Sequence, residues 1–159
     1  MEKEIIYVFI DSQNLNLSVR DQGWRLDFRK FYIYLKNKYK IVKAFLFIGY
    51  VDKNVDLYQK LEKIGYILIF KPTIPCEKDR IKGNVDAELV LYSMIEFCNY
   101  DKAIIVSGDG DFYCLIKYLL SKNKLKNIII PNMKKYSGLL KEFRKYSIFI
   151  NVLKDKLGK

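Results

Sequence analysis

The stretch that decides the fold is IIYVFID at residues 5–11, in which six apolar residues lead directly into an aspartate. The six are all β-branched or aromatic, and no polar residue alternates with them. Such a run predicts a strand buried on both faces, as strands of parallel sheets are. Asp11 then stands at the carboxyl end of this strand.

Similar apolar runs recur along the chain and alternate with longer amphipathic stretches. Further strands are expected at residues 44–50, 66–70, 103–106, 127–130 and, as a sixth, 148–152. Helical patterns cover residues 27–39, 54–64, 85–98, 111–123 and 137–145. This alternation predicts an α/β fold of right-handed βαβ units around a mostly parallel sheet of five or six strands.

The basic residues are concentrated at one end of the chain. Its 159 residues suit one domain, with no internal repeat or flexible linker, so we expect a single domain over residues 1–159 with a basic C-terminal part from about residue 112. Residues 112–159 hold 12 basic and 2 acidic side chains, whereas residues 1–111 hold 17 and 16. The excess favours an anionic partner, nucleic acid before a membrane surface, and a general lysine bias is the alternative explanation.

Several classes of protein are excluded by composition. The chain has no histidine, which excludes Ser-His-Asp and Cys-His catalysis and any His-ligated zinc site. Its three cysteines (Cys76, Cys98 and Cys114) are isolated, a pattern typical of a reducing cytosol. With no apolar run as long as a membrane span and no signal-peptide pattern, we expect a cytoplasmic protein without a membrane partner. Phosphate-binding P-loop, dinucleotide-binding and EF-hand patterns are also absent.

Three aspartates fall where a parallel sheet places its functional site. Asp11 ends the first strand, Asp109 follows the strand at residues 103–106, and Asp86 begins the helical stretch before that strand. In open α/β sheets the ligand site lies beyond the carboxyl ends of the strands. If the two strands are neighbours, the three carboxylates converge there.

Carboxylates held close together repel one another, and a divalent cation relieves this repulsion. Oxygen ligands without histidine or cysteine favour Mg²⁺ or Mn²⁺, as one ion or two. Such ions activate water and stabilise the charge of a phosphodiester under attack. An acidic pocket on a basic chain is therefore the pattern expected of a nuclease.

Each of these residues also has a purely structural interpretation. Asp11 and Asp111 are plausible turn or cap residues, and Gly108 and Gly110 permit a tight turn with positive φ. The remaining alternatives are a helix cap for Asn14, a solvated loop lysine for Lys82 and a favourable charge at a helix N-terminus for Asp86.

Three motifs, in this order, resemble the NYN domain family, the LabA-like branch of the PIN-like nucleases. They are DSQN at residues 11–14, KGNVD at residues 82–86 and SGDGDF at residues 107–112, with weaker similarities at residues 26–28, 49–50 and 71–72. The resemblance implies a Rossmann-like three-layer sandwich and a metal-dependent ribonuclease. It implies that Asp11, Asp86 and Asp109 bind the metal and that Asp111 supports it. Asn14 and Ser107 would orient these groups or the scissile phosphate, and Lys82 would contact phosphate.

The chain departs from the family at one position, because many relatives carry a further aspartate where this sequence has Tyr92. Glu88 lies on another helical face and is no obvious substitute. The main hypothesis is therefore a Mg²⁺/Mn²⁺-dependent endoribonuclease, and the alternative is an RNA-binding module with weakened catalysis. A small-molecule phosphatase is a third hypothesis, although Asp11 does not begin the D-x-D-x-[TV] run of aspartyl-phosphate enzymes.

Lysines interspersed with tyrosines over residues 117–145 supply the expected RNA-binding face. The individual phosphate contacts we expect first are Arg80 and Lys82, followed by Lys134 and Lys135. RNA, single-stranded or structured, is thus the predicted partner, and the sequence leaves a homodimer open.

Overall fold

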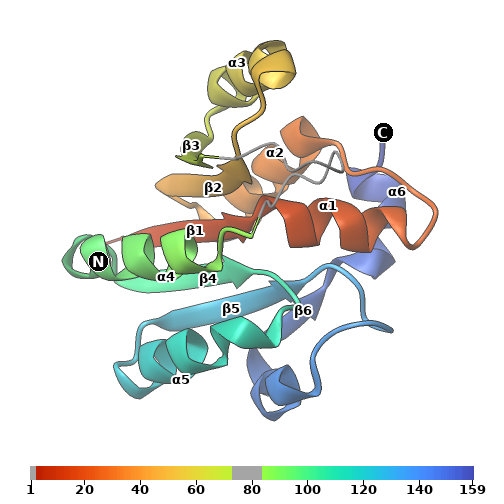
Figure 1. Ribbon diagram of the computed structural model, residues 1–159. Helices are drawn as coiled ribbons and strands as arrows, with labels where there is room; N and C mark the ends of the chain where they lie inside the picture. The colour runs from red at the N-terminus through yellow and green to blue at the C-terminus, as the bar shows by residue number, and fades with distance from the viewer. Residues whose placement is uncertain (1–2, 73–83) are drawn as a thin grey trace.

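A computed structural model of the chain describes residues 3–72 and 84–159, and it contains a six-stranded sheet in the order β3-β2-β1-β4-β5-β6. Every strand pair is parallel (Figure 1). The strands are β1 (Ile6–Asp11), β2 (Lys43–Gly49), β3 (Ile67–Lys71), β4 (Lys102–Val106), β5 (Leu125–Ile130) and β6 (Ser147–Phe149). The predicted α/β fold with a parallel sheet is confirmed.

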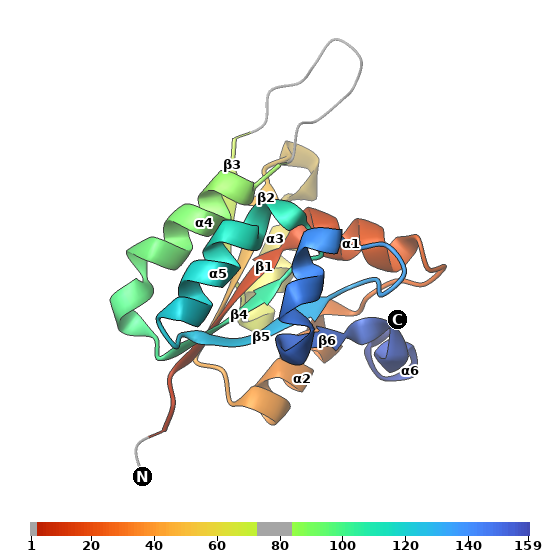
Figure 2. The same ribbon diagram turned by 90° about the horizontal axis from the view of Figure 1, so that it is seen from below.

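Helices cover both faces of the sheet. The α-helices are α1 (Ser12–Arg20), α2 (Phe28–Tyr39), α3 (Val55–Ile64), α4 (Asp86–Ile95), α5 (Tyr113–Ser121) and α6 (Lys154–Leu157). The short 3₁₀ segments are η1 (Asp52–Asn54), η2 (Phe97–Asn99), η3 (Gly110–Phe112), η4 (Gly138–Tyr146) and η5 (Ile150–Leu153). Figure 2 shows α4 and α5 side by side on one face, with α2 and α6 on the other.

Strand β1 contributes to the cores on both faces. Val8 and Ile10 pack in one core with residues of α1 and α2, whereas Tyr7 and Phe9 pack in the other with residues of α4 and α5. The apolar residues 6–10 are buried, as the uninterrupted run predicts, and so is Asp11 at the end of β1. Ile5, which precedes the strand, is 39% exposed. Successive side chains of a strand point to opposite faces of the sheet, and here both faces are covered by apolar layers. A polar residue is therefore tolerated only at the end of this strand.

Helix α1 was not expected from the sequence. Its segment SQNLNLSVR is mostly polar, and Leu15 and Val19 are the apolar residues that it buries. These two lie four residues apart and therefore share one helical face. The helix also begins with a side-chain cap, since Asp11 accepts a hydrogen bond from the Asn14 backbone N–H. So short an apolar stripe explains why periodicity does not indicate a helix here.

The topology fixes where the functional site lies. Strand β1 pairs with β2 on one side and with β4 on the other, and Ile10 is in register with Val106 of β4. The strands before β4 are added on one side of β1 and the later strands on the other, so the strand order reverses between β1 and β4. Open α/β sheets bind ligands at such a point. Asp11 and the Ser107–Asp111 segment emerge there together. Within the described ranges, every helix is too short or too polar to cross a bilayer.

Candidate metal centre

Asp11 combines a structural role with a place in the acidic site. It is 4% exposed, and its Oδ1 accepts a hydrogen bond from the Asn14 N–H at 3.2 Å, which caps α1. Its Oδ2 accepts from the Ser107 hydroxyl at 3.3 Å. Burial raises the pKa of Asp11, and the hydrogen bonds from Asn14 and Ser107 oppose that effect. Asp11 therefore caps a helix, as its structural interpretation predicts, and also belongs to the acidic group.

The segment after β4 is tied to the start of α1 by hydrogen bonds. The Asn14 side-chain oxygen accepts from the Gly108 N–H at 2.9 Å. The Ser107 hydroxyl, itself buried, accepts from the Asp109 N–H at 3.1 Å while it donates to Asp11. Asp109 Oδ1 in turn accepts from the Asp111 N–H at 2.9 Å and caps η3. Asn14 and Ser107 thus hold Asp11 and Asp109 in fixed positions relative to each other.

The two glycines in this segment are required by close packing, which corrects the expectation of positive φ. The glycines with positive φ among the described residues are Gly23 and Gly65. A Cβ on Gly110 would overlap the Ser137 side chain, and one on Gly108 would lie 3.1 Å from the Cβ of Tyr136. The glycines therefore allow the segment carrying Asp109 to approach the start of η4.

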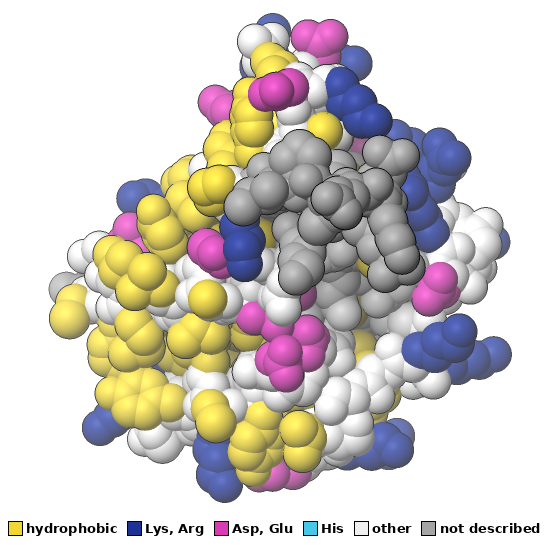
Figure 3. Space-filling model, viewed as in Figure 1, with side chains coloured by type: hydrophobic (Ala, Val, Ile, Leu, Met, Phe, Trp, Pro, Cys, Tyr) yellow, Lys and Arg dark blue, Asp and Glu magenta, His cyan; other side chains and the backbone are white. Residues whose placement is uncertain are grey.

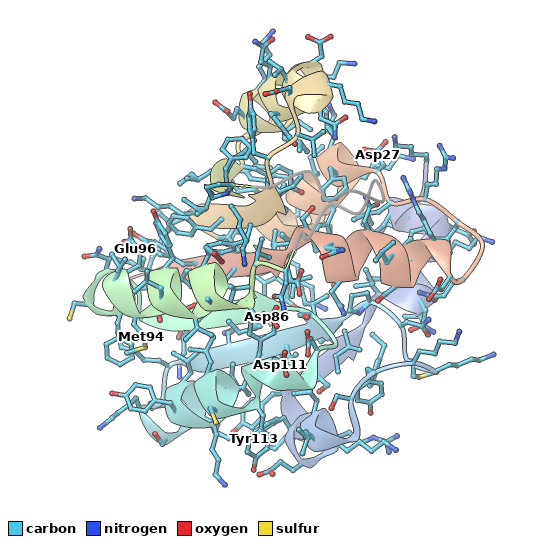
Figure 4. The ribbon with its side chains drawn as sticks, in the orientation of Figure 1. Asp27, Asp86, Met94, Glu96, Asp111 and Tyr113 are labelled. Atoms are coloured by element: carbon cyan, nitrogen blue, oxygen red, sulfur yellow. The ribbon has the colours of Figure 1, made fainter. Side chains whose placement is uncertain are left out.

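Asp86, the first residue of α4, brings the third carboxylate to the site. Its N–H donates to the Asn84 side-chain oxygen at 2.9 Å, which fixes the start of the helix. One carboxylate oxygen each from Asp11, Asp86 and Asp109 lie within 4.8 Å of one another. Figure 4 shows Asp86 and Asp111 close together where α4 approaches η3. Burial, followed by the nearby Asp111, Asp109 and Asp11, raises the pKa of Asp86 to about 7.

This group of atoms fits a hard divalent cation. All three groups offer carboxylate oxygens, the ligands preferred by Mg²⁺ and Mn²⁺. Asp86 Oδ2 is buried and has no hydrogen-bond partner among the described residues, so it remains available to a ligand. A cation placed among the three would remove the mutual repulsion that contributes to the raised pKa of Asp86.

The site opens into a cavity of about 250 Å³. It is lined by Asp11, Gln13, Asn14, Leu17, Ser18, Asp21, Asn84, Val85, Asp86 and Asp109. Exposed Asp111 lines a neighbouring cavity together with Asp109. Figure 3 shows acidic side chains gathered near the middle of one face, with apolar surface on one side and basic side chains on the other.

Lys71 was missed as a residue of this site. Its ammonium group donates to the Asn84 carbonyl at 2.5 Å and lies 3.7 Å from a carboxylate oxygen of Glu88. It therefore links the end of β3 to the start of α4, next to Asp86. The sequence signal was the Lys-Pro pair after a strand, whose contact with α4 depends on tertiary packing. Glu88 uses Oε1 in this ion pair, its Oε2 is buried without a hydrogen-bond partner among the described residues, and it is not part of the group formed by the three aspartates.

The other residues singled out by sequence have different fates. Tyr92 packs against Phe47 with ring centroids 5.9 Å apart, so its position supplies an aromatic core contact and no carboxylate. Lys134 and Lys135 are exposed after β5, and Lys135 lines the same cavity as Asp109 and Asp111. The two predicted contacts Arg80 and Lys82 lie outside the described residues.

Comparison with known proteins agrees with this geometry. The family model described as "NYN domain" matches residues 5–151. The chain belongs to the NYN domain family. It is also 27% identical over 125 residues to the low amplitude and bright protein LabA of Synechococcus elongatus, covering 72% of this chain and 67% of that protein. The LabA-like resemblance is thus confirmed.

A solved structure shares the fold. A Vibrio parahaemolyticus protein of unknown function superposes with a TM-score of 0.81 and 23% identity, covering 100% of both chains. NYN domains belong to the PIN-like nuclease superfamily, whose members generally use divalent metals and act on RNA. Asp11, Asp86 and Asp109 of this chain form an acidic cluster that could hold a metal ion.

Proposed function

We propose that this NYN domain is a Mg²⁺- or Mn²⁺-dependent endoribonuclease. The observation that carries the proposal is the convergence of Asp11, Asp86 and Asp109, from two adjacent strands' ends and one helix, to within 4.8 Å. Their oxygens would hold one or two ions. When bound, such an ion activates water for attack on a phosphodiester and neutralises charge that develops on the phosphate.

The chain's own side chains have distinct roles in this proposal. The Ser107 hydroxyl donates to the Asp11 carboxylate at 3.3 Å and accepts from the Asp109 N–H at 3.1 Å. The Asn14 side chain accepts from the Gly108 N–H at 2.9 Å, so both residues position the segment that carries Asp109. Asp111, two residues after Asp109, supports the centre from its exposed edge. Lys134 and Lys135 bind the RNA backbone near the site and offset the repulsion between phosphates and aspartates. By analogy with PIN-like enzymes, the products carry a 5′-phosphate and a 3′-hydroxyl.

The test is cleavage of end-labelled single-stranded and hairpin RNAs in Mn²⁺, Mg²⁺ or EDTA. Cleavage should require metal and fall by about 100-fold or more in Asp109→Asn, while RNA binding remains. Asp56→Asn on the exposed surface of α3 is the matched control and should cleave normally. Cleavage that survives both Asp11→Asn and Asp109→Asn would contradict the proposal.

A second candidate function is RNA binding with weak catalysis, and Tyr92 favours it. The Tyr92 ring packs against the apolar core and supplies no carboxylate. Helix α4 therefore contributes one carboxylate, that of Asp86, to the three-aspartate cluster. In that case RNA would be bound in a salt-sensitive manner and remain intact in either metal. For either function, we propose that residues 1–159 form one domain and that the protein is cytoplasmic.

A further inference from the structure

A second cavity, of about 390 Å³, lies beside the acidic site at the far end of α1. Its walls come from the end of α1, the loop after β5, and the η5–α6 segment. The lining residues are Asp21, Gln22, Trp24, Asn132, Lys134, Lys135, Asn151 and Lys154. Its volume is within the roughly 300–1,000 Å³ typical of small-ligand sites. Residues from distant parts of the sequence thus form one pocket of small-molecule size.

Three side-chain amides in this cavity retain unused hydrogen-bonding groups. Asn151 Oδ1 is buried without a partner among the described residues, which is a cost to folding unless a ligand satisfies it. Gln22 is held rigidly, because its NH₂ group donates to the Ser18 carbonyl at 2.9 Å and the Pro131 carbonyl at 2.7 Å, leaving its oxygen free to accept.

Asn132 is also fixed. It is 5% exposed, and its oxygen accepts from the Lys134 N–H at 3.0 Å, which leaves its NH₂ group as a donor. Rigid amides that offer both donors and acceptors match the edge of a nucleobase, which presents the same kinds of groups. Trp24, 8% exposed, adds an apolar wall for the face or rim of such a ring.

The rim of the cavity is basic. Lys134, Lys135 and Lys154 are exposed, and none forms an ion pair with a carboxylate in the described part of the chain. Asp21 is the acidic residue among those that line the cavity. Three lysines around a pocket of amides provide phosphate contacts on the outside and base contacts within.

This cavity and the acidic site are connected through shared residues. Asp21 lines both of them, and Lys135 lines both this cavity and the one beside Asp109. From Asn14 to Asp21 the chain advances seven residues along α1, or about 10 Å at a helical rise of 1.5 Å per residue. A short single strand of RNA can therefore span the two.

We propose that this cavity binds one unpaired base of the RNA near the scissile phosphate and selects it by the amides of Asn151, Gln22 and Asn132. The inference rests on the proposed function and adds sequence preference to it. An unpaired base is required because pairing occupies the edge that the amides would contact. The preferred substrate is thus single-stranded at this nucleotide.

The test measures binding, by fluorescence anisotropy in EDTA with short labelled RNAs of each base and an abasic RNA of equal length. Wild-type protein should bind one base about fivefold or more tightly than the least favoured, and the abasic RNA most weakly. Asn151→Ala should reduce the preference to less than about twofold and leave the salt dependence unchanged. Its melting temperature should be unchanged or higher, because an unsatisfied buried oxygen is removed.

Three further variants sharpen the result. Asn151→Asp keeps the shape of the side chain and its acceptor oxygen but adds a negative charge, so it should weaken the binding of every RNA. Lys134→Ala should weaken all the RNAs equally and lower the salt slope by about one. Asn37→Ala, exposed on α2, is the matched control and should behave as wild type.

The outcomes separate the two proposals. Equal affinity for all bases and for abasic RNA, or a base preference that persists in Asn151→Ala, would overturn base selection. Metal-dependent cleavage would be unaffected by either result. Absence of RNA binding at low salt would overturn both proposals.

Discussion

Replacing Asp86 with asparagine should stabilise the metal-free protein in a pH-dependent way. The pKa of Asp86 is about 7 in the folded protein against 3.8 in an unperturbed chain, chiefly because of burial and then the neighbouring Asp111 and Asp109. Between those values the folded protein retains a proton that the unfolded chain has lost. Its stability therefore falls as pH rises from about 4 to about 7 and stays at the lower level above that.

The size of the effect follows from the same shift. A change from 3.8 to about 7 corresponds to about 4 kcal/mol if no water screened the carboxylate. Asp86 is partly exposed, so screening reduces this to about 2 kcal/mol. Asp86→Asn should thus be more stable than wild type by about 2 kcal/mol at pH 8, and the gain should vanish near pH 4.

Urea unfolding in EDTA at several pH values, followed by circular dichroism, measures this difference. Asp56→Asn is the control, because Asp56 also lies in the first turn of a helix but is not part of the three-aspartate cluster. It should lose at most about 0.5 kcal/mol, through the helix dipole. Adding Mn²⁺ should stabilise the wild type and not Asp86→Asn. A gain that does not change with pH, or a loss equal to that of the control, would refute the reasoning.

Three other outcomes are expected. Ser107→Ala removes a hydrogen bond to Asp11, so it should lower the free energy of unfolding by about 1–2 kcal/mol. It should also weaken Mn²⁺ binding in a calorimetric titration, and an unchanged metal affinity would contradict the positioning role of Ser107. Gly110→Ala should cost about 1–3 kcal/mol through overlap with Ser137, and the loss should be partly recovered with Ser137→Gly. Mn²⁺ affinity of the wild type should fall as pH drops below about 7, because protons compete for Asp86, and a flat profile from pH 8 to 5.5 would argue against this ligand.

The sheet was predictable because its signal is local. The run of apolar residues at 5–10 requires apolar layers on both faces, and residues 6–10 are buried between such layers in β1. Helix α1 was not, because Leu15 and Val19 make too short a stripe and its start depends on a cap from Asp11. Its existence follows from packing that only the folded chain supplies.

The convergence of Asp11, Asp86 and Asp109 could be anticipated from topology, since strand ends in a parallel sheet meet at one edge. The contact of Lys71 with Asn84 and Glu88 could not, because it depends on where the start of α4 lies relative to the end of β3. The cavity around Asn151 was equally hidden, as its walls are assembled from segments more than 100 residues apart, such as Gln22 and Asn151. Metal binding by the three aspartates and RNA binding by the cavity around Asn151 are predictions.

The double use of Asp11 has a consequence for how such a protein can lose activity. Its carboxylate ends β1, caps α1 and accepts from Ser107, so a neutral substitution there disturbs folding and chemistry at once. Asp86 carries no comparable structural duty, and its removal is expected to stabilise the metal-free chain. Loss of the proposed activity through mutation should therefore occur first at position 86, and it would leave a more stable protein whose proposed RNA-binding surface is unchanged.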